Sequence, residues 1–94
     1  MKISGIIWLE TIVEKIARKY QVNQSEIREV LRNSGHFRFV EKGHRQGENV
    51  YAAMGQTDAG RYLIVFFVRK KTQQALILSA RDMTRSERRR YEKK

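Results

Sequence analysis

The longest apolar run of the chain is Tyr62-Leu63-Ile64-Val65-Phe66-Phe67-Val68, which Arg61 precedes and Arg69 follows. The run is far too short to cross a bilayer. Its unbroken apolar character is typical of a central β-strand that is covered on both faces. A tight turn, Thr57-Asp58-Ala59-Gly60, stands directly before it, with a glycine available for a positive φ. The run therefore predicts the centre of a sheet, around which the rest of the chain folds.

Shorter strand patterns lie on both sides of this run. Residues 36–39 alternate between polar and apolar side chains, which is the period of a half-buried strand. The other expected elements are strands at 50–56 and 74–80, a mobile loop at 43–47 and, at residues 3–8, a short edge strand or a packed lead-in.

Three segments have the pattern of helices. Residues 10–20 place their apolar side chains on one helical face. Capping boxes, which begin helices, stand at Asn23 with Glu26 and at Thr84 with Glu87. The order of elements predicts an α+β fold in one domain spanning residues 1–94. It has two N-terminal helices, an antiparallel β-meander of three to five strands, and one C-terminal helix.

The chain is strongly basic. Its 94 residues include 20 Lys+Arg and 10 Asp+Glu, a formal net charge of +10. Residues 79–94 hold seven basic and three acidic side chains, so this short segment carries +4 by itself. Such an excess attracts nucleic acid, an anionic membrane or an acidic protein, and we favour RNA among these. There is no cysteine for a disulfide or a thiolate metal site, and we expect a cytoplasmic protein.

No conventional catalytic set stands out in the sequence. His36 and His44 are the two histidines, and each is expected to be a surface residue of a strand or loop. No metal-ligand spacing occurs, so no cofactor is expected.

Two arginines stand at strand ends instead. Arg61 begins the central strand and Arg81 ends the strand expected to pair with it, so both are predicted at the same edge of the sheet. Two planar guanidinium groups meeting there could bind one phosphate. The spacing leaves an alternative open, in which Arg61 pairs with Asp58 and Arg81 pairs with Asp82.

The C-terminal segment follows Arg81. On a helix, Arg81, Arg85 and Arg88 would share one face. Tyr91 would either pack on the sheet or present its hydroxyl to a substrate.

Two stretches resemble the BrnT family of bacterial toxins. They are residues 55–65, Gly-Gln-Thr-Asp-Ala-Gly-Arg-Tyr-Leu-Ile-Val, and residues 78–91, Leu-Ser-Ala-Arg-Asp-Met-Thr-Arg-Ser-Glu-Arg-Arg-Arg-Tyr. The family pattern is a glycine turn with Gly-Arg before an apolar strand, then ISAR-x-x-T-x-x-E-R-x-x-Y. Trp8 matches the opening tryptophan, and residues 19–22 stand where the family has Lys-His-Gly-Val. This sequence departs from the pattern at Leu9, usually aspartate, and at Tyr20, usually histidine.

The resemblance implies a RelE-like fold and an endoribonuclease toxin of a type II toxin–antitoxin pair. It implies catalytic roles for Arg61, Arg81 and Tyr91, and RNA contacts by Lys19, Arg85 and Arg88. We also expect the basic side chains of Arg45 and Arg89 to contact RNA. RNA would be cut through its own 2′-hydroxyl, with no metal required, either free or on the ribosome. The implied protein partner is a BrnA-like antitoxin, and operator DNA would be contacted only through that complex. No membrane partner is expected.

Two other functions stay open from the sequence. Residues 17–31 have the order helix, short turn and helix, as in a DNA-binding helix-turn-helix, although Glu26 and Glu29 would repel phosphate. The departures at Leu9 and Tyr20 are also compatible with a degenerate toxin fold that binds a partner without catalysis.

Overall fold

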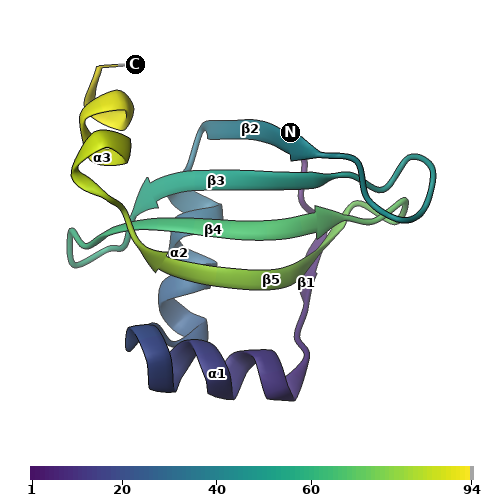
Figure 1. Cartoon of the computed structure of the whole chain (residues 1–94), viewed down its shortest axis with the longest axis horizontal. Coiled ribbons are helices and arrows are strands. Elements are labelled where there is room, and N and C mark those ends of the chain that lie inside the picture. Colours follow the sequence, from purple (N-terminus) through teal and green to yellow (C-terminus); the bar gives the residue numbers. More distant parts are fainter. Residues whose placement is uncertain (94) are drawn as a thin grey trace.

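The computed structural model describes residues 1–93 and contains five strands and three helices (Figure 1). Their order is β1 (Gly5–Ile7), α1 (Glu10–Tyr20), α2 (Gln24–Asn33), β2 (His36–Glu41), β3 (Val50–Gln56), β4 (Tyr62–Arg69), β5 (Gln74–Asp82) and α3 (Arg85–Glu92). The predicted α+β class is confirmed, and every predicted helix and strand is present. The strand expected at 74–80 continues to Asp82, so Arg81 belongs to β5 and does not share a helical face with Arg85 and Arg88.

The five strands form one sheet in the order β1-β5-β4-β3-β2. Strands β2 to β5 make the predicted antiparallel meander, with β4 in the middle. The opening segment is an edge strand, and it pairs with β5 in parallel through Gly5↔Gln74 and its neighbours. The sheet is therefore mixed rather than purely antiparallel, because β1 reaches it from a distant part of the chain rather than through a hairpin.

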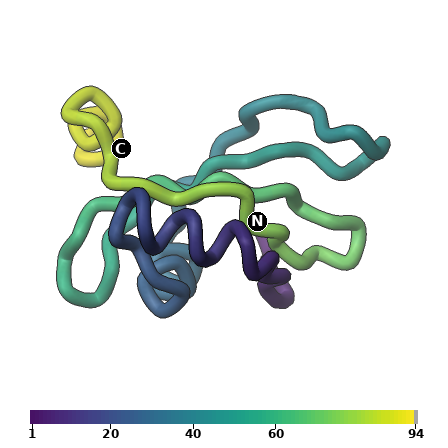
Figure 2. The backbone as a smooth tube through the Cα atoms, turned by 60° about the horizontal axis from the view of Figure 1, so that its bottom comes forward, coloured from purple at the N-terminus to yellow at the C-terminus, as the bar shows by residue number. Residues whose placement is uncertain are grey.

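Helices α1 and α2 lie on one face of the sheet, and α3 stands on the opposite side near the end of β5 (Figure 2). We call these the helix face and the open face. On the helix face, Leu63, Val65 and Phe67 of β4 are fully buried and pack with the apolar side of α2. Burial of this kind is worth roughly 1.5–3 kcal/mol for each large side chain.

The open face has a much smaller apolar cluster. Ala52, Met54 and Ile64 are buried there, with Phe66 and Tyr91 packed beside them. Phe66 and Val68 are only half-buried, so the expectation that the central strand is covered on both faces holds only for part of its length. The open face therefore keeps accessible surface beside α3.

Leu9 and Gln21 stand at the two ends of α1, where the BrnT pattern has aspartate and glycine. Leu9 occupies the N-cap position and supplies no capping hydrogen bond, which an aspartate there would do. Gln21 ends the helix with φ 53°, in the left-handed region that favours glycine. Both substitutions therefore replace residues suited to helix ends with residues that are not.

Candidate functional site

Arg61 is enclosed by partners on the helix face. Its Nε donates to Asp82 Oδ1 at 2.9 Å, and its Nη2 donates to Asp82 Oδ2 at 3.1 Å. Nη1 donates to the Gln21 carbonyl at 2.7 Å and to both carboxylate oxygens of Glu26 at 3.2–3.3 Å, and Nη2 also reaches the Tyr20 carbonyl at 3.0 Å. The hydrogen bond with Arg61 lowers the pKa of Asp82, and that with Asp82 raises the pKa of Arg61. Every nitrogen of this guanidinium has a protein acceptor.

Arg81 makes a different cluster on the open face. Its Nη1 and Nη2 donate to the two carboxylate oxygens of Glu87 at 2.8 and 3.0 Å, and Nη1 also donates to the Asp82 carbonyl. The guanidinium lies 5.5 Å from the centre of the Phe66 ring. Glu87 accepts from Thr84 N as well, which completes the capping box of α3. The hydrogen bonds from Arg81 lower the pKa of Glu87 to about 2.

The prediction that Arg61 and Arg81 converge on one phosphate is wrong. Leu63 is paired with Asp82 on the helix face, whereas Ile64 is paired with Arg81 on the open face. Successive side chains of a strand point to opposite faces, so residues 61 and 81 are sent to opposite sides of the sheet. The alternative ion pairs were also assigned to the wrong acids. Asp58 pairs with Arg32, while Asp82 pairs with Arg61.

Two rows of side chains cross the open face. The register pairs His36 with Met54, Met54 with Ile64, and Ile64 with Arg81. The second row runs through Arg38, Ala52, Phe66 and Ser79. Both rows have an apolar middle and polar residues at the outer strands. A groove of about 270 Å³ lies over this middle and is lined by Ala52, Ile64 and Phe66, by residues 38–40 of β2, and by Glu87.

Helix α3 extends from Arg81 towards His36. Strands are about 4.8 Å apart, which separates the backbones of His36 and Arg81 by about 14 Å. Glu87 contacts Arg81, and one turn later the Tyr91 ring packs edge-on against His36 at 6.2 Å and against Tyr62 at 6.0 Å. The helix therefore places an acid and a phenol beside the groove, and the phenol ring contacts the imidazole of His36 on β2.

The other residues predicted to bind RNA are spread over the molecule. Arg85 and Arg89 are exposed on α3, and Arg88 stacks 3.8 Å from the centre of the Tyr62 ring. Lys19 lies at the end of α1 with its ammonium 5.3 Å from the Tyr20 ring. Arg45 lies in the loop between β2 and β3, in a hollow shared with Glu48 and Lys70. The structure brings together the α3 arginines and Arg81, but neither Arg61 nor Arg45 belongs to that group.

Sequence reasoning missed two residues of the open face. His36 was expected to be an ordinary surface residue, and Arg38 was used only as a sign of strand alternation. The same alternation places them on one face of β2, because they are two residues apart. What the sequence lacked was the register that aligns this strand with Arg81.

Residues 1–93 contain no group of three acidic, histidine or cysteine side chains able to hold a metal ion. Within the same residues, no helix combines the length and apolar character that crossing a bilayer requires. A larger hollow, about 410 Å³, lies on the helix side between β1 and α2, away from Arg81 and Tyr91. We assign the candidate site to the smaller groove because groups able to bind phosphate and transfer protons meet there.

No protein-family model matches the chain, and no curated protein does so either. Among solved structures, the chain is similar to the crystal structure of the Brucella abortus ribonuclease toxin BrnT. The two superpose with a TM-score of 0.61 over 86% of this chain and 97% of that one, at 14% sequence identity. The predicted BrnT-like fold is confirmed by this similarity.

Proposed function

We propose that this chain is an endoribonuclease toxin of a type II toxin–antitoxin pair, which binds RNA on the open face of its sheet. The observation that carries the proposal is the groove beside Arg81, where α3 adds Glu87 and Tyr91 and β2 adds Arg38. The shared fold with a ribonuclease toxin supports it, and so does the net +4 of residues 79–94, which include all of α3.

The groove suits a single strand of RNA. Phe66 lines it, and an aromatic ring gives a base a stacking surface at about 1–3 kcal/mol. Arg38 and Arg81 can approach a phosphate from two sides of Phe66, while the exposed arginines of α3 hold the continuing backbone. This pair, Arg38 with Arg81, replaces the pair first predicted from the sequence.

The proposed reaction uses the nucleophile that RNA carries. The 2′-oxygen attacks the adjacent phosphorus, a 2′,3′-cyclic phosphate forms, and the bond from phosphorus to the 5′-oxygen breaks. Arg38 and Arg81 stabilise the charge that develops on the phosphate oxygens. His36 takes the proton of the 2′-hydroxyl as a general base, and the Tyr91 phenol gives one to the leaving 5′-oxygen as a general acid. In this proposal Arg61 positions the ends of α1 and β5 without touching RNA.

Glu87 sets a condition on this chemistry. Its carboxylate already holds the two Nη atoms of Arg81, so a phosphate must either displace it or bind through Arg81 Nε. A carboxylate and a phosphate compete for the same guanidinium geometry. RNA binding on this face is therefore expected to loosen the contact between α3 and β5.

Purified protein should be incubated with RNA, with and without ribosomes, and the new ends should be mapped. Products with 2′,3′-cyclic phosphate and 5′-hydroxyl ends are expected, while DNA of the same sequence stays intact because it lacks the nucleophile. Arg38→Ala is the most informative variant because Arg38 is exposed and its removal spares the fold. Lys15→Ala, exposed on α1, is the matched control. Undiminished cleavage by the Arg38 variant would rule out this site.

The proposal extends to the partner. A BrnA-like antitoxin would inhibit the toxin by binding an acidic segment over Arg81 and α3. In the complex, the antitoxin rather than this chain would contact operator DNA. Arg61 is not part of this proposed interface, because its donors are already satisfied within the fold. Weakening of the complex by salt and by Arg85→Glu is the expected result; a complex indifferent to both would contradict the placement.

One observation favours a second candidate, a toxin fold that binds without cutting. Arg81 is held by Glu87 through two short hydrogen bonds, and Tyr20 replaces the histidine of the BrnT pattern. Expression in bacteria without an antitoxin separates the two functions. Growth arrest that Arg81→Ala relieves supports the enzyme, whereas normal growth with RNA binding retained supports the second candidate.

The DNA-binding helix-turn-helix has less support. Helices α1 and α2 do follow one another, but Ile27, Val30 and Leu31 bury one side of α2 against the sheet. The first turn of α2, which would have to approach bases, presents Glu26 to Arg61.

A further inference from the structure

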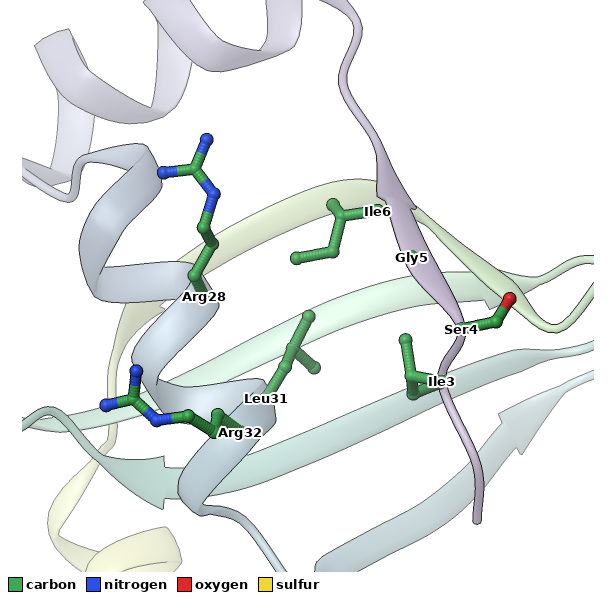
Figure 3. A pocket seen from close by; sticks show the side chains of 7 residues that line it. All are labelled: Ile3, Ser4, Gly5, Ile6, Arg28, Leu31 and Arg32. Atoms are coloured by element: carbon green, nitrogen blue, oxygen red, sulfur yellow. The ribbon is translucent and has the colours of Figure 1, made fainter.

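A hollow larger than the proposed RNA groove lies on the helix side of the sheet. Figure 3 shows residues 3–6 on one side and Arg28, Leu31 and Arg32 of α2 on the other. Ile3, Ile6 and Leu31 point into the space between β1 and α2, and its volume is about 410 Å³. The walls are mostly apolar, so the hollow can accept a leucine-sized side chain.

The side chains of Arg28 and Arg32 line the α2 side of this hollow, and in Figure 3 their guanidinium groups extend away from β1. Arg28 and Arg32 are one helical turn apart, about 6 Å along the axis. Arg28 lies 5.3 Å from the centre of the Trp8 ring and has no ion pair with any acid among residues 1–93. Arg32 pairs with Asp58 at 2.7 Å, but both side chains are more than half exposed, and such surface pairs contribute little and exchange readily.

Exposed apolar surface lies close by in the chain. Leu9, directly after Trp8, is 46% exposed at the N-cap of α1, where a polar side chain would cap the helix. An exposed leucine in place of a cap is consistent with a surface that is covered by a partner.

We propose that this hollow binds an acidic segment of a partner protein. The segment inserts one apolar side chain between β1 and α2 and sets two carboxylates, about 6 Å apart, against Arg28 and Arg32. The positive charge beside the hollow favours an acidic protein segment over a second copy of this chain. A second copy of the chain also carries +10 and would bring positive charge to a positive rim, and nucleic acid would leave the apolar walls unfilled.

The site goes beyond the proposed ribonuclease activity and does not depend on it. The hollow is on the helix side, whereas Arg81 and α3 are on the opposite side of the sheet (Figure 2). A segment held between β1 and α2 therefore leaves the open face uncovered, and it can anchor a partner while that face remains able to bind RNA.

The test uses a synthetic helical peptide in which two glutamates, four positions and so about 6 Å apart along the helix, flank a leucine. Its affinity for the full chain is measured by fluorescence anisotropy, and its site is mapped by the amide chemical shifts of residues 3–9 and 28–32. Arg28→Glu should weaken binding at least about tenfold, since it replaces attraction with repulsion. Arg85→Glu, the same charge reversal on exposed α3, should change affinity by less than about threefold through long-range charge alone.

Two altered peptides separate charge from apolar contact. Replacing the leucine by alanine and replacing both glutamates by lysine should each weaken binding. Arg28→Ala, with thermal unfolding measured alongside, repeats the test without introducing an acid. Absence of peptide binding, equal loss in the Arg28 and Arg85 variants, or displacement of the peptide by RNA would each overturn the proposal. None of these outcomes depends on whether the chain cleaves RNA.

Discussion

The Arg61 and Arg81 clusters lie at the same end of the sheet and do different things. Around Arg61, six acceptor atoms of Tyr20, Gln21, Glu26 and Asp82 satisfy the guanidinium completely. Around Arg81, a single carboxylate from α3 takes both Nη atoms, and an open groove lies alongside. The comparison teaches that an arginine's position along a strand does not define its role. The face of the sheet to which it points decides whether it holds α1, α2 and β5 together or attaches α3 beside an open groove.

The largest effect is expected from Arg81→Ala. Removing one group that stabilises a developing negative charge costs about two to three orders of magnitude in rate, so RNA cleavage should fall by that factor. Single-turnover cleavage measured beside Lys15→Ala checks it. Cleavage within a few-fold of wild type would leave the Arg81 cluster as a structural contact only.

Arg61→Ala should instead act on stability. It leaves Glu26 and Asp82 without their cation and two carbonyls without a donor, which should lower the free energy of unfolding by about 2–3 kcal/mol. Urea denaturation gives this value, and cleavage measured under fully folded conditions should stay near the wild-type rate. A stable variant with lost cleavage would reverse the roles assigned to the two arginines.

The pH dependence of the Arg81 cluster follows from Glu87. Its pKa is lowered from 4.5 to about 2 in the folded protein by the hydrogen bonds from Arg81. A depressed carboxylate pKa stabilises the fold above the ordinary pKa, and this contribution is lost as pH falls from about 4.5 towards about 2. The stability difference between wild type and Glu87→Gln, measured by thermal unfolding, should therefore shrink over that range. A difference that stays constant down to pH 2 would show that the Arg81–Glu87 pair does not stabilise the attachment of α3.

The smallest effect is expected from Gln21→Gly, at the residue whose backbone carbonyl accepts a hydrogen bond from Arg61. Gln21 is held at φ 53° while its carbonyl accepts from Arg61, so Gln21→Gly keeps the acceptor and removes the steric conflict. Stability should rise by up to about 1 kcal/mol, with no change in RNA cleavage. A destabilised variant would mean that the hydrogen bond from the Gln21 side chain to the Arg18 carbonyl matters more than the strain.

Most of the fold could be predicted from local patterns. The capping boxes at Asn23 and Thr84 begin α2 and α3 where the sequence places them, because a cap and its partner are three residues apart and need no tertiary information. The apolar run at 62–68 is the middle strand, and its position could be predicted because an unbroken apolar run is also a local property of the sequence. The parallel pairing of β1 with β5 was not foreseen, since nothing near residues 5–7 specifies a partner almost seventy residues away.

The site was only partly predictable. Arg81, Tyr91 and the α3 arginines lie together as expected, while the grouping of Arg61 with them was wrong. His36 and Arg38 were overlooked, although their two-residue spacing already placed them on one face of β2. Their catalytic and RNA-binding roles stay proposals, as does the antitoxin partner.

The sequence by itself determined which segments become helices and strands, the excess of positive charge, and the resemblance to the BrnT family that the fold supports. These properties depend on periodicity, caps and composition, all of which are local. The tertiary structure decided which side of the sheet each arginine occupies and which acid holds it. Those outcomes depend on strand register, where the alternation of side chains means that a shift of one residue exchanges the two faces.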